Sequence, residues 1–255
     1  MNFRLRPTLA LMGIALIAAA PATMAASASQ QLAAAVADQS RPAADRERDA
    51  DRKPAELIAL TGMHEGAKIA EILPGGGYFT RIFSKLVGPQ GVVYAWVPLP
   101  AANAAPGGRD MAAPMRALAA EPGYSNIKVA DFNPASPNPL PEKVDLVWTS
   151  LNYHDMRNRP NADLAPTNKM VFDALKPGGL YVVIDHAAKA GATDSATLHR
   201  VDAELVKQDV TSVGFKLVQE SDLLRHPADD RTKATREIDR GKTDQFVLMF
   251  QKPAG

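Results

Sequence analysis

Histidine and aspartate residues stand together at two points of this sequence, each at the end of an apolar segment. His154 and Asp155 follow residues 144–150, and Asp185 and His186 close the segment that begins at residue 180. An imidazole is largely neutral at neutral pH and accepts a proton readily, so a well-placed histidine serves as a general base. The pattern predicts proton transfer, with His154 as the expected base, His186 as its rival and Asp155 as a third candidate catalytic residue. Structural roles stay open, because histidines bridge loops and aspartates cap helices.

Two further residues of the same kind follow along the chain. His199 and Arg200 lie in a helical pattern, which places three of the five histidines in this set. Imidazole and carboxylate groups also ligate divalent metals, but these residues lack the tight spacing of a metal motif. The sequence therefore predicts no metal site.

A second candidate site is the segment "EILPGGGYFT" at residues 71–80, in which three glycines follow an apolar run. Glycine allows positive φ and a close approach of the backbone to a ligand. A helix that begins near Phe79 would point free N–H groups at that ligand. The alternative is a tight turn between a strand and a helix, with no ligand.

The spacing around these glycines argues against two common ligands. A Walker loop needs Gly-Lys-Ser/Thr, which is absent, and Thr80 stands where the dinucleotide fingerprint has its last glycine. An acid expected about 20 residues later is replaced by "YAWV" at residues 94–97. A nicotinamide oxidoreductase is therefore disfavoured.

These residues need a sheet to position them, and the hydrophobic pattern supplies one. Apolar segments predict seven strands, at residues 68–73, 91–97, 127–132, 144–150, 180–185, 215–220 and 245–251. Helical patterns separate several of them, at residues 79–87, 111–120, 168–175 and 195–213. The alternation predicts an α/β fold: a Rossmann-like, doubly wound, mostly parallel seven-stranded sheet with an antiparallel edge strand and helices on both faces.

The composition is that of an ordinary globular chain. It has 255 residues, 46% hydrophobic and 22% charged, which suffices for one sizeable core. A net charge of +1 gives no argument for a nucleic-acid partner, and the absence of cysteine excludes thiol catalysis and disulfides.

The N-terminus has the layout of a secretory signal peptide. Arg4 and Arg6 precede the 12-residue apolar run 9–20, and small residues follow it. The run is shorter than the roughly 20 residues of a membrane span, so we expect no stable membrane insertion after cleavage. The alternative is an N-terminal anchor that is not cleaved. We predict a signal peptide at 1–26, a polar and charged lead at 27–54 and a single domain at 55–255. The expected location is periplasmic or secreted.

Several motifs together resemble the class I S-adenosylmethionine-dependent methyltransferases. "EILPGGGY" looks like their first motif, "VDLVWTSLNYHD" (144–155) is similar to their fourth-strand motif, and "ALKPGGLYVVIDH" (174–186) is the most specific match. The resemblance spans residues 48–253 and is closest to members that carry a signal peptide. In those motifs the Lys-Pro-Gly-Gly segment is a structural turn before the fifth strand.

The resemblance implies S-adenosylmethionine as cofactor and methyl transfer to a small-molecule acceptor. It assigns cofactor binding to Glu71, Pro74, Gly75, Gly76, Gly77, Tyr78, Trp96, Asp131 and Asn152. Two departures concern the same site: Leu73 replaces a frequent glycine, and the second strand lacks the acid that holds ribose. Trp96 could stack on adenine or simply pack, and Asp131 could take part of the missing acid's role. The alternative function is an exported binding protein on this fold without turnover.

Overall fold

The computed structural model describes residues 20–100 and 110–255, with side chains from residue 28 onward. The predicted signal peptide lies largely outside these residues, and its last part belongs to helix α1. Among the described helices, none combines the length and the apolar character needed to cross a membrane.

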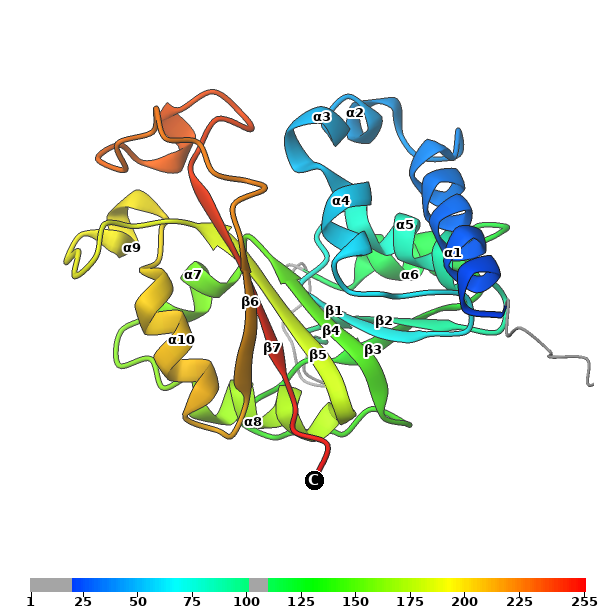
Figure 1. Cartoon of the computed structure of the whole chain (residues 1–255). Coiled ribbons are helices and arrows are strands. Elements are labelled where there is room, and N and C mark those ends of the chain that lie inside the picture. Colours follow the sequence, from blue (N-terminus) through cyan, green and yellow to red (C-terminus); the bar gives the residue numbers. More distant parts are fainter. Residues whose placement is uncertain (1–19, 101–109) are drawn as a thin grey trace, which may run out of the picture.

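Seven strands form one sheet in the order β3-β2-β1-β4-β5-β7-β6 (Figure 1). Pairing is parallel from β3 to β5, and β7 runs antiparallel to both of its neighbours. This confirms the doubly wound sheet with an antiparallel pair at one edge. The strands are β1 (Lys68–Ile72), β2 (Val92–Val97), β3 (Ile127–Asp131), β4 (Val144–Ser150), β5 (Leu175–His186), β6 (Lys216–Ser221) and β7 (Gln245–Gln251).

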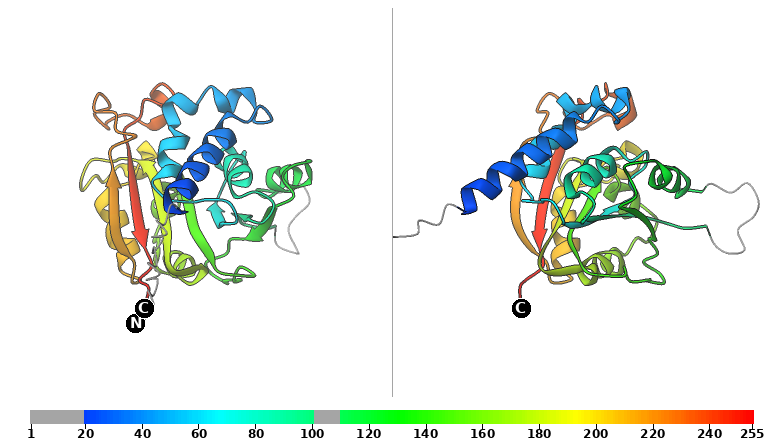
Figure 2. Two further views of the ribbon diagram at one scale, coloured as in Figure 1. Left: turned by 45° about the vertical axis from the view of Figure 1, so that its right-hand side comes forward. Right: turned by 90° about the vertical axis from the view of Figure 1, so that its right-hand side faces the viewer.

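Helices cover both faces of the sheet, as Figures 1 and 2 show. One face carries α1 (Ala20–Ala37), α4 (Pro54–Ala59), α5 (Tyr78–Val87) and α6 (Ala113–Ala120). The other carries α7 (Tyr153–Arg157), α8 (Ala165–Ala174) and α10 (Ala203–Thr211). Three short α-helices, α2 (Ala43–Arg46), α3 (Asp49–Arg52) and α9 (Ser195–Leu198), and the 3-10 helix η1 (Thr235–Glu237) complete the described elements.

Each face of the sheet has its own apolar core because side chains alternate along the strands. Ile69 and Trp148 lie in the core under α5, whereas Ala70 and Trp96 lie in the core under α7 and α8. Most positions of the five parallel strands β1 to β5 are apolar on both faces, which is why continuous apolar runs located them.

Two local predictions were wrong. The helix expected at 195–213 is interrupted: His199 has φ 52° and ends α9, and the Asp202 side chain accepts a hydrogen bond from the Glu204 N–H to cap α10. The turn expected at Lys176–Gly179 is the irregular start of β5, where the register with β4 shifts and Gly178 donates to the Lys252 carbonyl.

The segment 27–54 is folded against the sheet domain. Leu32 and Ala35 of α1 are buried beside α5. Arg41 is 1% exposed, and its guanidinium donates two hydrogen bonds to the Asp49 carboxylate at 2.7 and 2.8 Å. The polar lead therefore forms one wall of the molecule, and α2 and α3 lie beside the 222–244 excursion (Figure 2).

Candidate active site

The three glycines of the loop after β1 have different surroundings. A Cβ built on Gly75 or Gly76 would meet no atom within 4 Å, so both positions border open space. A Cβ on Gly77 would lie 2.9 Å from Met115 Cε and 3.0 Å from Leu118 Cδ2. Three residues of the loop have left-handed backbone conformations, namely Leu73 with φ 51°, Gly75 with φ 59° and Gly77 with φ 84°. Gly75 and Gly76 form the open cradle, while Gly77 serves packing against α6.

A cavity of about 230 Å³ opens above this loop. Its walls come from the glycine-rich loop, from the end of β4 and from the N-terminal helices. The lining residues are Asp45, Arg48, Arg52, Glu71, Leu73, Pro74, Gly75, Gly76, Tyr78, Phe79, Ser150, Leu151 and Asn152. Six of the nine predicted cofactor residues are among them; Gly77, Trp96 and Asp131 are not.

Asn152 fixes the mutual position of two of these walls. Its side-chain amide donates to the carbonyl of Ile72, the carbonyl of Leu73 and the carbonyl of Ser150, at 3.3, 3.2 and 2.9 Å. The loop after β1 is thereby tied to the end of β4. Asn152 therefore lines the cavity, as predicted, and its side-chain amide hydrogen-bonds to backbone carbonyls there.

Trp96 and Asp131 lie elsewhere. Trp96 is fully buried in the core under α7 and α8, where it packs edge-on against Phe132 and its indole N–H donates to the Asp131 carbonyl at 2.7 Å. Its ring has no face on the cavity, which favours the packing interpretation. The Asp131 carboxylate stands at the end of β3 beside Val97 and accepts from the Leu99 N–H.

Glu71 is a buried acid that lines the cavity above the glycine-rich loop. It is 4% exposed and accepts a hydrogen bond from the Thr80 hydroxyl at 2.5 Å. Burial raises its pKa to about 7, although Thr80 and the charge of Arg52 act in the opposite direction. Glu71 therefore exchanges a proton near neutral pH.

Two arginines of the N-terminal segment form the roof of this cavity. Arg52 stacks on the Tyr78 ring at 4.1 Å and on the Phe79 ring at 4.6 Å, and Arg48 lies 5.3 Å from the Tyr78 centroid. The Tyr78 hydroxyl donates to Asp49 at 2.6 Å, which fixes the ring. Burial, together with the charge of Arg48, lowers the Arg52 pKa to about 10. The Arg52 guanidinium donates to the Ser150 hydroxyl at 3.0 Å, and no carboxylate among the described residues forms an ion pair with it.

Sequence reasoning missed both arginines. They belong to the charge run 45–54, which is typical of a solvated helix face or a linker. Their spacing of four residues, which would put both on one side of a helix, was the available signal. The aromatic rings that hold them lie more than 20 residues away in the sequence, so local pattern could not reveal the contact.

A larger cavity of about 590 Å³ adjoins the first. Five residues line both: Arg48, Arg52, Phe79, Ser150 and Leu151. Its remaining walls come from α2 and α3 on one side and from residues 235–245 on the other. The two cavities thus meet at the ends of β4 and the N-terminal helices.

His186 is the one predicted catalytic residue that lines this larger cavity. Its Nδ1 lies 2.9 Å from the Thr243 hydroxyl. Burial lowers its pKa to about 4, because the nearby charge of Asp185 only partly offsets the desolvation. The ring is therefore neutral at neutral pH.

His154 lies behind His186 and lines neither cavity. It is 6% exposed, and its ring centroid is 5.9 Å from that of His186. Asp185, which is fully buried, accepts hydrogen bonds from the His154 N–H at 2.8 Å, from His154 Nδ1 at 2.7 Å and from the His186 N–H at 2.7 Å. Burial opposes protonation of His154, but the hydrogen bond and charge of Asp185 outweigh it and raise the pKa.

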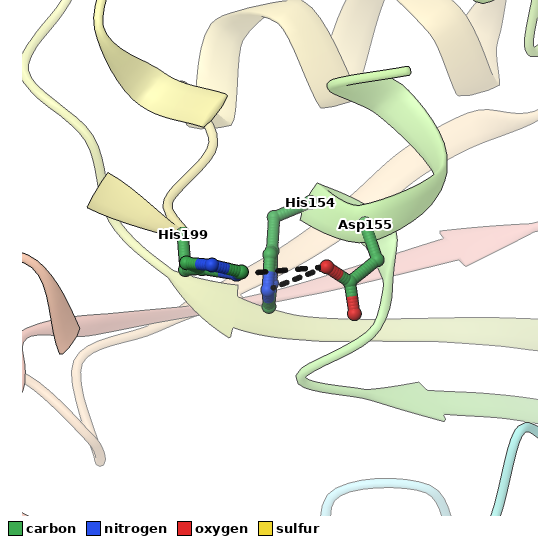
Figure 3. Close-up of side chains that lie close together, drawn as sticks. All are labelled: His154, Asp155 and His199. Atoms are coloured by element: carbon green, nitrogen blue, oxygen red, sulfur yellow. Dashed lines mark ion pairs between the residues drawn. The ribbon is translucent and has the colours of Figure 1, made fainter. Parts of the chain in front are cut away.

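On the far side of His154, Asp155 and His199 complete a cluster (Figure 3). Asp155 Oδ1 is 3.4 Å from His154 Nε2 and 3.7 Å from His199 Nδ1. One nitrogen or oxygen atom from each of the three residues lies within 4.8 Å of the others. Residues 45 positions apart in the sequence are brought together here, which the sequence did not predict.

Comparison with known proteins places the fold. No protein-family model and no curated sequence matches the chain. An S-adenosylmethionine-dependent methyltransferase from Aquifex aeolicus matches with TM-score 0.54 and 16% identity, over 80% of this chain and 92% of its own. One from Mesorhizobium loti matches with TM-score 0.51 and 17% identity, over 77% and 96%. The [4+2]-cyclase SpnF matches with TM-score 0.60 and 16% identity, over 89% and 93%.

These identities establish a shared fold. The chain has the Rossmann-like fold of the S-adenosylmethionine-dependent methyltransferases, as the sequence motifs implied. Because SpnF shares this fold and is named a cyclase, the fold by itself leaves the reaction to be argued from the site.

Proposed function

We propose that this protein binds S-adenosylmethionine and transfers its methyl group to a small-molecule acceptor. The observation that carries the proposal is the pair of adjoining cavities. The smaller one lies over an open glycine cradle at the carboxyl end of β1, where doubly wound sheets bind nucleotide-like ligands, and the larger one adjoins it at the end of β4. One cavity suits the donor, and the other offers room for an acceptor.

The residues of the smaller cavity fit the donor. Gly75 and Gly76 leave room for close approach, and the guanidinium groups of Arg48 and Arg52 suit its carboxylate. When bound, the donor supplies a methyl group on a sulfonium centre. Asp131 does not line this cavity, so the place of the usual acid at the end of β2 is left without a carboxylate.

For the acceptor, proton removal falls to His186 in this proposal. Its ring lines the larger cavity, whereas that of His154 does not. Asp185 and Thr243 position the His186 backbone and ring. A positioned general base contributes about 10²- to 10⁴-fold in rate. Once a substrate screen has identified an acceptor, His186→Ala should reduce kcat within that range and leave donor affinity unchanged. If His154→Ala lost turnover and His186→Ala kept it, the base would be His154.

Donor binding is the primary test. Calorimetric titration of the wild-type protein with S-adenosylhomocysteine should show one site. Gly76→Val should abolish that binding with little loss of stability, because Gly76 has no positive φ and faces open space. Ala190→Val, at an exposed position outside both cavities, is the matched control and should bind normally. Unchanged affinity in Gly76→Val would remove this loop from the site.

A binding protein without turnover is the second candidate. The missing acid at the end of β2 favours it, since Val97 stands there and weakens the ribose site. Tight donor binding, with no methylated product across an acceptor library, would support this candidate over the first. The absence of any donor binding would contradict both.

We also infer export to the periplasm or outside the cell, from the layout of residues 1–26. The mature chain should then begin between residues 26 and 29. N-terminal sequencing of the exported protein tests this, and a chain that still begins at Met1 would contradict it.

A further inference from the structure

The cluster of His154, Asp155 and His199 stands outside both cavities and has no part in the function proposed above. His154 and Asp155 come from the first turn of α7, and His199 is the residue that ends α9 (Figure 3). Each contributes one atom that can ligate a metal ion, and two of these separations are 3.4 and 3.7 Å.

Those separations match a coordination sphere. Nitrogen and oxygen ligands of zinc lie about 2.0–2.2 Å from the metal, so at tetrahedral angles they are about 3.3–3.6 Å from one another. The separations of Asp155 Oδ1 from the two imidazoles fall close to this range. The Asp155 and His199 side chains, which are 58% and 48% exposed, have room to rotate around an ion.

The buried neighbour of His154 prepares its ring for this role. Asp185 accepts from Nδ1 at 2.7 Å, so in the neutral ring the proton is on that nitrogen and the lone pair is on Nε2, toward Asp155 and His199. Metal-binding histidines are typically oriented by a carboxylate in this way. Asp185 is itself fixed by two backbone N–H donors, so the ring orientation is set before any ion arrives.

The chain path brings His199 to the cluster. Its φ of 52° is the left-handed conformation in which many helices end, and here it ends α9 beside α7. In this position His199 Nδ1 lies 3.7 Å from Asp155 Oδ1, on which His154 Nε2 also converges at 3.4 Å. Two imidazoles from separate helices therefore meet at one carboxylate, which is the arrangement that a shared cation requires.

We propose that His154, Asp155 and His199 form a binding site for one divalent transition-metal ion of the zinc or cobalt type. Two imidazole nitrogens and one carboxylate oxygen suit such ions, whereas Mg²⁺ prefers oxygen ligands alone. Three protein ligands leave at least one coordination position for water, and the exposure of Asp155 and His199 places it toward solvent.

The test uses protein without an affinity tag, so that no added histidines bind metal. After chelation and dialysis, the protein is titrated with Co²⁺ and followed by visible absorption, then challenged with Zn²⁺ and, separately, Mg²⁺. We expect one equivalent of Co²⁺ to bind, Zn²⁺ to displace it, and Mg²⁺ to have no effect at the same concentration. The absence of a Co²⁺ site, or displacement by Mg²⁺, would overturn the proposal.

Variants locate the site. Mutation of a residue that only orients a metal ligand costs about 10- to 100-fold in metal affinity. His199→Ala and Asp155→Ala remove metal ligands themselves, so each should weaken Co²⁺ binding on the order of 100-fold or more. Both side chains are exposed, and circular dichroism should show unchanged folding. His64→Ala, an exposed histidine far from the cluster in sequence, is the control and should bind normally. Unchanged affinity in His199→Ala would show that Co²⁺ binds elsewhere and would overturn the assignment. Because donor binding is measured separately, this result stands or falls independently of the proposed methyl transfer.

Discussion

The glycine-rich loop after β1 and the histidine cluster beyond β4 and β5 are at the same edge of the sheet but are built in opposite ways. The loop offers backbone and empty space, with Gly75 and Gly76 open on one side and Gly77 closed by Met115 and Leu118. The cluster consists of side chains, and Asp185 behind it accepts from the His154 ring and from the backbone N–H groups of His154 and His186. The loop can bind a ligand only because its glycines lack side chains. The cluster keeps its geometry only while each side chain and its hydrogen-bond acceptor are present.

This difference predicts how the two regions respond to substitution. At the loop, adding atoms does the damage, and the position of the added atom decides whether binding or folding is lost. At the cluster, removing atoms does the damage, because buried donors lose their acceptor. The following four changes test the contrast, from the largest expected effect to the smallest.

Asp185→Ala should cause the largest loss of stability. It leaves three donors of His154 and His186 without their carboxylate in a buried environment, which costs about 4 kcal/mol in the free energy of unfolding. Urea denaturation measures the loss. Asp155→Ala, next to the same histidine but exposed, should change stability by less than about 1 kcal/mol. Equal losses in the two variants would contradict the role of Asp185 as the buried acceptor that holds His154.

Gly77→Val should destabilise the fold by about 3 kcal/mol, through a positive φ and contacts below 3.2 Å with Met115, Leu118 and Arg81. Gly76→Val, one position away, should leave the unfolding midpoint nearly unchanged. Thermal or urea unfolding of the pair separates packing from ligand access. A Gly77→Val protein as stable as the wild type would contradict the assignment of Gly77 to packing and of Gly76 to the open cradle.

Glu71 should make stability depend on pH. Its pKa is raised from 4.5 to about 7 in the folded protein, so the protonated form is favoured there, and this stability is lost as pH rises. Between pH 5 and pH 7 the loss amounts to about 2 kcal/mol. Glu71→Gln cannot titrate, so its stability should fall less over that interval when both proteins are unfolded in urea. Parallel pH profiles for the two proteins would contradict the raised pKa.

Trp96→Phe should have the smallest effect. The change removes the hydrogen bond to the Asp131 carbonyl and part of a buried ring, which costs about 1 kcal/mol. Donor affinity should stay the same, because the indole has no face on the cavity. A marked loss of S-adenosylhomocysteine binding, measured by calorimetry, would restore the adenine-stacking role considered from the sequence.

The sheet could be predicted because its signal is local. Runs such as "VDLVWTS" are apolar on both faces, and their number and order define the fold class. The break in the helix at His199 was harder to see, because it depends on the Asp202 cap and on a left-handed residue within a helical pattern. The spacing of apolar residues indicated neither the Asp202 cap nor the left-handed conformation of His199.

Only part of the candidate site could be identified from the sequence, because some of its contacts join residues that are far apart in the chain. The glycine-rich loop is one continuous motif, so its residues could be named together. The sequence favoured His154 over His186 as the base, and only the folded chain shows that His186, and not His154, lines the larger cavity. The role of Arg52 depends on Tyr78 and Phe79, whose packing onto the charge run appears only once the chain is folded.

The larger cavity has one wall from the start of the described chain and another from near its end. Asp51 belongs to the first of these walls and Lys242 to the segment that forms the second. The two residues form an ion pair although they are 191 positions apart in the sequence. Closing so long a loop carries an entropic cost that local contacts do not repay, and such contacts form late in folding. An emerging chain therefore acquires the glycine-rich loop well before the larger cavity can close. A molecule truncated before residue 235 would keep β1 and its loop yet lack the residues between 235 and 245 that line the larger cavity.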